Sequence, residues 1–352
     1  MGTSLWWRKV TASGRRVWGA RDFPARGDFS PKMSKDRFSN PWPHAEHGVM
    51  DILKWKLMPW LVRDRAEFPD LKGPAGWQVA DLSAPSDGEW KVTWLGHASF
   101  LIQGRGRRLL VDPVFSSHCS PVPLPSLRRL VEPPCAVADL TPVDAVLLTH
   151  SHYDHLDLAT LRELMAVGGD CQILVAEGHG GWLRGKGFHR VEEVRWGECS
   201  DLIDGLRIHS TPAQHFTARS LRDRNRGHWC GWLIDDGEVK IWHAGDSGYC
   251  DAFLEIGGRY GFVDFAMIPI GAYSPRSVMR AMHLNPREAV RVFSDVQCRF
   301  AVGMHWGTFR LTDEPMGEPP ELLRLECEKA GLGEDRFVIG KIGESWTVGP
   351  VT

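Results

Sequence analysis

Hydrophobic residues in the greater part of this chain form short runs, each followed by polar or glycine-containing sequence. Apolar runs of this length, bounded by turn residues, are typical of buried strands. Stretches with the spacing of amphipathic helices lie between several of them, at 158–167, 286–293 and 320–330. Strands alternating with helices predict an α/β fold in which helices cover the sheets. The predicted strands lie at 92–95, 109–111, 145–148, 173–175, 239–242, 265–268 and 300–303.

The residues before position 90 follow other patterns. Residues 1–38 carry nine Lys and Arg against three Asp, with three tryptophans among them. A basic arm of this kind suits an anionic membrane surface, and a disordered solubilising tail is the alternative. Residues 39–89 include an amphipathic stretch at 49–62, expected to pack on the main domain near the active-site groove or to lie in a membrane interface. Three segments are therefore predicted: the arm at 1–38, the extension at 39–89 and the main domain at 90–352.

Composition narrows the class of protein further. The chain has 352 residues, of which 43% are hydrophobic, enough for a sizeable core. A net charge of -2 argues against nucleic-acid binding, which usually needs a basic excess. We find no signal-peptide pattern and no apolar stretch near the roughly 20 residues of a membrane span. These features predict a cytoplasmic protein that contacts a membrane peripherally at most.

The most informative segment is an H-x-H-x-D-H motif directly behind the apolar run at 145–148. It contains His150, His152, Asp154 and His155. Imidazole nitrogens and carboxylate oxygens are the ligands that zinc and similar divalent ions prefer. Their number exceeds what one tetrahedral ion with an open position needs, so the motif suggests two metals. A polar turn whose histidines cap the next helix is the alternative, and it accounts for one or two of these histidines.

Other candidate ligands follow the ends of other predicted strands. His215, Asp246 and His305 each lie a few residues beyond an apolar run, as do His97 and Asp112. A strand that holds a loop residue at its end is a common way to position a site. Each of these residues taken alone is equally well explained as a helix cap or a hydrogen-bonding residue.

The order of these motifs resembles the metallo-β-lactamase fold superfamily of hydrolases. Further motifs, Gly-Ala-Tyr at 271–273, His-Leu-Asn-Pro at 283–286 and His-Trp-Gly-Thr-Phe at 305–309, are similar to those of the N-acylphosphatidylethanolamine-hydrolysing phospholipase D family. The similarity extends from about Phe38 to Glu344. It implies an αββα sandwich, in which two mixed sheets are covered by helices on their outer faces.

The resemblance also implies roles for individual residues. One zinc is expected on His150, His152 and His215, a second on Asp154, His155 and His305, and Asp246 is expected to bridge the two. His283 is expected to contact the phosphate and to protonate the leaving group, unless it caps the helix that starts at Pro286. Three residues are expected to orient the ligands: His97, Asp112 and Asp157. Asp157 has the alternative role of helix N-cap. Eight histidines lack defensible ligand spacing: His44, His47, His118, His179, His189, His209, His228 and His243.

The activity implied by the resemblance is hydrolysis of a phosphodiester. A hydroxide shared by two zinc ions is expected to attack the phosphorus of N-acylphosphatidylethanolamine, which yields N-acylethanolamine and phosphatidic acid. Expected partners are the phospholipid and a membrane surface, and a homodimer is compatible with the resemblance. A lactonase, a soluble phosphodiesterase and a non-catalytic zinc protein at a membrane remain as alternatives, because acyl-chain recognition depends on a groove that the sequence does not display.

Overall fold

The computed structural model describes most of the chain after position 74. The basic arm at 1–31 and much of the amphipathic stretch at 49–62 lie outside the described residues. Described are residues 32–34, 36–44, 51, 54, 55, 57, 58, 61, 64–68, 73, 75–220 and 222–350. A short hairpin of β1 (Lys32–Ser34) and β2 (Arg37–Ser39) comes first.

Two mixed sheets of seven strands form the centre of the molecule. The first has the order β16-β3-β4-β5-β6-β7-β8, antiparallel from β16 to β5 and parallel from β5 to β8. Its strands are β3 (Trp90–Gly96), β4 (Ser99–Gly104), β5 (Arg107–Val111), β6 (Ala145–Leu148), β7 (Gln172–Ala176), β8 (Val191–Val194) and β16 (Ser345–Val348).

The second sheet has the order β15-β14-β13-β12-β11-β10-β9. Its strands are antiparallel from β9 to β12 and parallel from β12 to β15. They are β9 (Cys199–Ser200), β10 (Arg207–Thr211), β11 (Gly231–Asp235), β12 (Lys240–His243), β13 (Val263–Pro269), β14 (Cys298–Met304) and β15 (Phe337–Val338).

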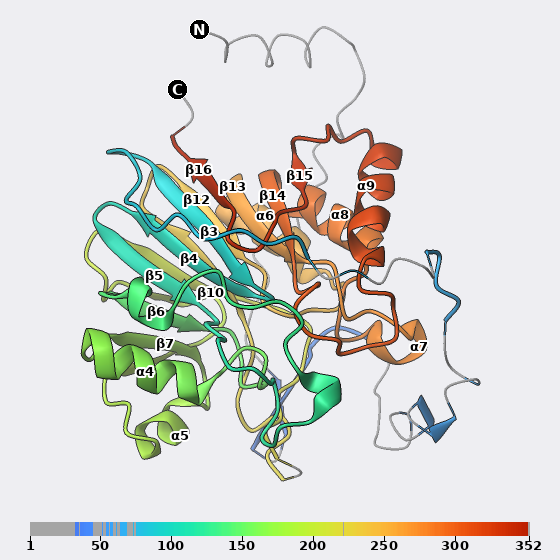
Figure 1. Cartoon of the computed structure of the whole chain (residues 1–352), viewed down its shortest axis with the longest axis horizontal. Helices are drawn as coiled ribbons and strands as arrows, with labels where there is room; N and C mark the ends of the chain where they lie inside the picture. The colour runs from blue at the N-terminus through green and yellow to red at the C-terminus, as the bar shows by residue number, and fades with distance from the viewer. Residues whose placement is uncertain are drawn as a thin grey trace, which may run out of the picture.

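Helices lie on the outer sides of the stacked sheets (Figure 1). Figure 1 shows α4 and α5 beside the first sheet, and α8 and α9 beside the second. The helices are α4 (Leu158–Gly168), α5 (Gly180–Gly185), α6 (Ala252–Tyr260), α7 (Arg276–Met279), α8 (Pro286–Asp295) and α9 (Glu318–Ala330), with 3-10 turns η1 (Pro125–Leu127) and η2 (Val137–Leu140). The expected αββα sandwich is thereby confirmed. No helix among the described residues combines the length and apolar character needed to cross a bilayer.

The strands of the first sheet are apolar on both faces because each face meets a different core. Leu147 of β6 packs in the core shared with the second sheet, whereas its neighbours Val146 and Leu148 pack with Leu161 and Leu164 of α4. Alternate residues of a strand point to opposite faces, so a strand buried on both sides shows a continuous apolar run. All seven predicted strands and all three predicted helices are present.

Candidate metal centre

Ends of strands from both sheets meet at one place and deliver the candidate ligands. β6 leads into His150, β10 into His215, β12 into Asp246 and β14 directly into His305. Three site residues at strand ends have positive φ: His97 at 52°, Asp112 at 43° and His305 at 63°. A non-glycine residue in this region costs on the order of 1 to 3 kcal/mol, and such residues cluster at functional sites.

The Gly-Asp pair at 245–246 forms a turn that requires glycine at its first position. Gly245 has φ 64°, and a Cβ there would lie 2.3 Å from the carbonyl oxygen of Cys230. Only glycine accepts this conformation and this close approach without strain. The turn therefore brings Asp246 into the cluster at the end of β12.

His150, His152 and His215 form the first group of donors. Nδ1 of His152 lies 2.9 Å from Nε2 of His150 and 3.2 Å from Nε2 of His215. Burial lowers the pKa of all three, to about 4 for His152, to about 3 for His215 and well below the usual value for His150. The three imidazoles are therefore neutral, which is the form that binds a metal.

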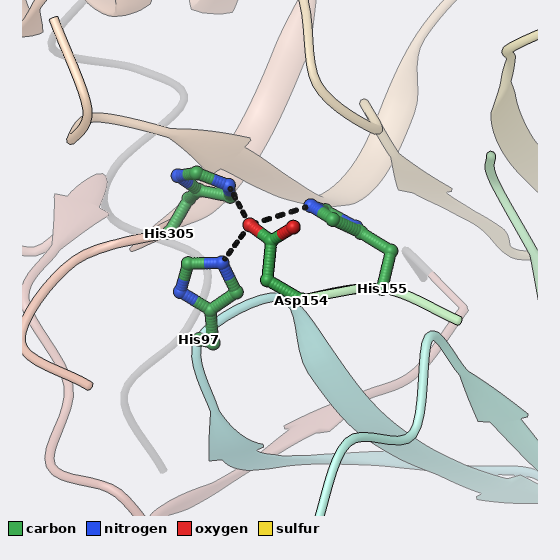
Figure 2. Close-up of side chains that lie close together, drawn as sticks. All are labelled: His97, Asp154, His155 and His305. Carbon is green, nitrogen blue, oxygen red and sulfur yellow. Dashed lines mark hydrogen bonds and ion pairs between the residues drawn. The ribbon is translucent and has the colours of Figure 1, made fainter. Parts of the chain in front are cut away.

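Asp154, His155 and His305 form the second group, and His97 lies beside them (Figure 2). Oδ2 of Asp154 lies 3.6 Å from Nε2 of His155 and 3.5 Å from Nε2 of His305. Nε2 of His97 donates to the same oxygen at 2.9 Å. Burial is the main cause that lowers the pKa of His97 to about 3, so this imidazole is a neutral hydrogen-bond donor to Asp154.

Asp246 lies between the two groups. Its Oδ2 is 3.1 Å from Nε2 of His155 and 3.0 Å from Nε2 of His305, which belong to the second group. The same oxygen is 3.7 Å from Nε2 of His215 and 4.0 Å from Nε2 of His150, which belong to the first. One carboxylate therefore reaches both groups, as a bridging ligand must.

The electrostatics of the cluster fit bound cations. Burial alone raises the pKa of Asp246, but the charges of His155 and His305 hold it well below its usual value. Conversely, burial opposes protonation of His305, whereas Asp246 and Asp154 raise its pKa to about 9. Oδ1 of Asp246 is buried without a hydrogen-bond partner among the described residues. Buried polar atoms rarely lack partners, so this convergent set of donors has the chemistry of a metal site.

Asp112 forms hydrogen bonds to the candidate ligand His155 and to Thr149. Its Oδ2 accepts Nδ1–H of His155 at 2.7 Å and the hydroxyl of Thr149 at 2.5 Å, and its Oδ1 accepts the Thr149 backbone N–H. A carboxylate in this position fixes the tautomer and the orientation of the imidazole. His97 acts in the same way on Asp154, through the hydrogen bond described above.

Replacing Asp112 with asparagine is expected to weaken metal binding about 10- to 100-fold, the usual effect of losing such a partner. The asparagine keeps the shape but loses the charge that holds His155. Competition with a chromogenic chelator measures the change. Asp170→Asn, which alters an exposed aspartate, is the control. Equal affinities for Asp112→Asn and the control would show that the hydrogen bond to His155 does not support the site.

His283 faces the cluster and does not cap the following helix. Its Nδ1 is 3.9 Å from Oδ2 of Asp246, and its ring lies 5.1 Å from that of His215. The N-cap of α8 is instead Asn285, which forms a capping box with Glu288. The capping alternative for His283 is therefore wrong, and this side chain is available at the edge of the ligand set.

Asp157 has the second of its two expected roles. Its Oδ1 accepts the backbone N–H of Ala159 as the N-cap of α4, and its Oδ2 accepts the hydroxyl of Thr160 and the backbone N–H of Ser116. None of its described hydrogen bonds reaches a candidate ligand. Asp157 therefore holds the helix and a neighbouring loop.

Asn40 is a site residue whose role the sequence did not reveal. Its Nδ2 donates to the carbonyl of His215 at 3.0 Å, and its Oδ1 accepts the backbone N–H of His215 at 3.1 Å. These two hydrogen bonds join the N-terminal extension to a candidate ligand 175 positions away. In the sequence, Asn40 lies at the start of the region of family similarity, and no chemistry was assigned to it.

The histidines that were excluded from the site lie outside the ligand set where they are described. The buried His243 donates Nε2–H to the carbonyl of Ala98 at 2.9 Å. His179 likewise bonds to the carbonyl of His228 at 2.7 Å. Both are satisfied core residues, and His47 lies outside the described residues.

Comparison with known proteins defines the class to which this fold and cluster belong. Residues 107–306 match the family model of the beta-lactamase superfamily domain. A metallo hydrolase of Ignicoccus hospitalis has a similar structure, with a TM-score of 0.57 and 25% identity over 74% of this chain and 98% of the other. The chain is therefore a metal-dependent hydrolase of the β-lactamase superfamily.

Two curated relatives narrow the assignment. The first is N-acyl-phosphatidylethanolamine-hydrolyzing phospholipase D 1 of Caenorhabditis elegans, 35% identical over 72% of this chain and 75% of the relative. The second is an uncharacterized protein of Mycobacterium tuberculosis, 39% identical over 88% of this chain and 83% of the relative. The chain belongs to the N-acylphosphatidylethanolamine-hydrolysing phospholipase D family.

Proposed function

We propose that this protein is a dinuclear zinc phosphodiesterase of the phospholipase D type. Its substrate is N-acylphosphatidylethanolamine, and its products are N-acylethanolamine and phosphatidic acid. The observation that carries the proposal is the position of Asp246, whose Oδ2 lies within 4.0 Å of nitrogens from both groups of donors. The name of the Caenorhabditis elegans relative supports the substrate.

The ligand set matches zinc in type and number. His150, His152 and His215 would hold one ion, Asp154, His155 and His305 the other, and Asp246 both. Imidazole and carboxylate are ligands that zinc favours. When bound, a pair of such ions lowers the pKa of a shared water toward neutrality and stabilises charge on the phosphoryl oxygens.

Side chains of the protein then determine how the reaction proceeds. His283 is placed to contact the phosphate, because its Nδ1 faces Asp246 and has no hydrogen-bond partner among the described residues. Burial lowers the pKa of His283 well below its usual value, so it offers a neutral N–H to a phosphoryl oxygen. Water oxygen bonds to phosphorus, and the bond from phosphorus to the ethanolamine oxygen breaks. The departing oxygen takes up a proton that the attacking water releases, which gives N-acylethanolamine.

The proposal includes peripheral contact with a membrane. Trp55 is buried against Val278 and Met279 of α7, the helix that precedes His283, and its Nε1 donates to Asp313 at 2.7 Å. On the same segment Leu57 is 68% exposed and Leu61 is 65% exposed. Exposed apolar side chains on an anchored segment suit a lipid interface. This supports a protein that reaches its lipid at the membrane surface.

A product analysis tests the proposal directly. Zinc-loaded protein is incubated with vesicles of N-acylphosphatidylethanolamine, with vesicles of unmodified phosphatidylethanolamine, with a soluble phosphodiester and with a sugar lactone. We expect N-acylethanolamine and phosphatidate from the first, identified by mass, and co-sedimentation of the protein with the vesicles. Ring opening of the lactone without lipid cleavage would replace the proposal with a lactonase. Cleavage of the soluble diester alone would indicate a different phosphodiesterase.

A further inference from the structure

Arg219 lies against the loop that carries the H-x-H-x-D-H motif. Its Nη1 donates to the carbonyl of Ser151 at 2.7 Å and to the carbonyl of Leu156 at 2.8 Å. These two carbonyls lie on either side of His152, Asp154 and His155 in the sequence. A single guanidinium nitrogen therefore holds both ends of the ligand-bearing segment.

Aromatic contacts fix the plane of this guanidinium. Its carbon lies 3.9 Å from the ring centroid of Tyr153 and 5.1 Å from that of Trp182. The Tyr153 hydroxyl donates back to the carbonyl of Arg219 at 3.2 Å. Arginine stacks flat on aromatic rings, which lysine cannot do, so the contacts specify this residue type. The backbone N–H of Arg219 donates to Asp223, which fixes the start of its own loop.

Arg219 also connects the two sheets at the site. The H-x-H-x-D-H loop follows β6 of the first sheet, whereas His215 and Arg219 follow β10 of the second. The first group of donors combines ligands from both loops, because His150 and His152 come from one and His215 from the other. Its geometry therefore depends on how the two sheets are held together at this edge.

We propose that Arg219 is a positioning residue that sets the separation between the ligands supplied by the two sheets. The described hydrogen bonds of its guanidinium go to the carbonyls of Ser151 and Leu156 and to no candidate ligand side chain, so it acts through the loop. The inference rests on the proposed function, since it assigns a support to the proposed metal centre. No feature of the motif itself indicates this partner, which lies more than 60 positions further along the chain.

Zinc affinity of the folded protein tests the inference. Arg219→Ala, Arg219→Lys and the wild-type chain are titrated with zinc in competition with a chromogenic chelator. We expect Arg219→Ala to bind zinc about 10- to 100-fold more weakly, as when other outer partners of metal ligands are lost. Arg219→Lys should recover part of the affinity, because an ammonium donates to the same carbonyls but does not stack on Tyr153. Arg222→Ala, an exposed arginine of the same loop, should match the wild type.

Thermal unfolding of the same variants separates positioning from general stability. A lower midpoint for Arg219→Ala with unchanged zinc affinity would overturn the inference. If Arg219→Ala does not fold, Tyr153→Leu takes its place, because it removes the stacking ring and its hydroxyl. Tyr153→Leu should weaken zinc binding to a smaller degree. Unchanged zinc affinity in Tyr153→Leu would also overturn the inference. If the wild-type chain binds a single zinc and Arg219→Ala weakens the binding of that zinc, the dinuclear centre is contradicted and the role of Arg219 stands.

Discussion

Asp246→Asn should abolish most of the activity and release zinc. The substitution keeps the size of the side chain but removes the charge that faces both groups of donors, with His155 and His305 at 3.1 and 3.0 Å. Loss of a bridging carboxylate removes several kcal/mol of charge stabilisation, which corresponds to a fall in turnover of about 10³-fold or more. Elemental analysis should find fewer than two zinc equivalents per chain.

Asp251→Asn is the matched control, because Asp251 is an exposed aspartate five positions away. This variant should retain wild-type turnover and zinc content. Two tightly bound zinc equivalents and near-normal turnover in Asp246→Asn would show that Asp246 does not bridge. A fully active wild-type preparation containing one zinc or none would contradict the dinuclear centre itself.

His283→Ala should slow turnover by about 10²-fold or more while both zinc equivalents remain bound. His283 lies beside the ligand set, with Nδ1 at 3.9 Å from Asp246, and it belongs to neither of the two groups of three. Its loss therefore removes a phosphate contact, and losing one such contact has an effect of this size in other hydrolytic sites. Turnover of N-acylphosphatidylethanolamine at saturating zinc measures it.

A second substrate separates the two roles of His283. Bis(4-nitrophenyl) phosphate has a leaving group that needs no proton, so a residue that only protonates the leaving oxygen should be dispensable for it. Because burial lowers the pKa of His283, we expect His283→Ala to reduce turnover of both substrates by a similar factor. This is the result expected when a phosphate contact is removed. His189→Ala, at an exposed histidine, is the control. Normal turnover of both substrates by His283→Ala would remove His283 from the mechanism.

Site residues that lie close together in the chain could be predicted from the sequence. The H-x-H-x-D-H motif identified four donors, since a short loop after a buried strand keeps its residues within a few ångströms of each other. Asp246 was indicated by its place a few residues beyond an apolar run, and the structure explains the glycine before it by its positive φ and by the carbonyl of Cys230 beside it. Strand ends also indicated His215 and His305, because a sheet gathers the ends of its strands at one edge.

Supporting contacts between distant segments could not be predicted. Asn40 pairs with the backbone of His215, and Arg219 with the carbonyls of Ser151 and Leu156, through ordinary hydrogen bonds that leave no pattern in the sequence. Likewise, the choice between a cap of α8 and a site residue for His283 depended on side-chain direction. A polar residue before a helix has both options until the tertiary structure orients it.

The sequence by itself determined an α/β fold with helices covering the sheets, through apolar runs and helical periods, and the types of donor in the site; the αββα sandwich was implied by the family resemblance. Tertiary structure decided which face of each strand meets which core, how the two groups of donors share Asp246, and which residues hold them in place. The physical reason is that periodicity and ligand chemistry are local properties of the chain. Distances of 3 to 4 Å between side chains from different sheets, such as those from Asp246 to His155 and from Asp154 to His305, arise only when the sheets pack together.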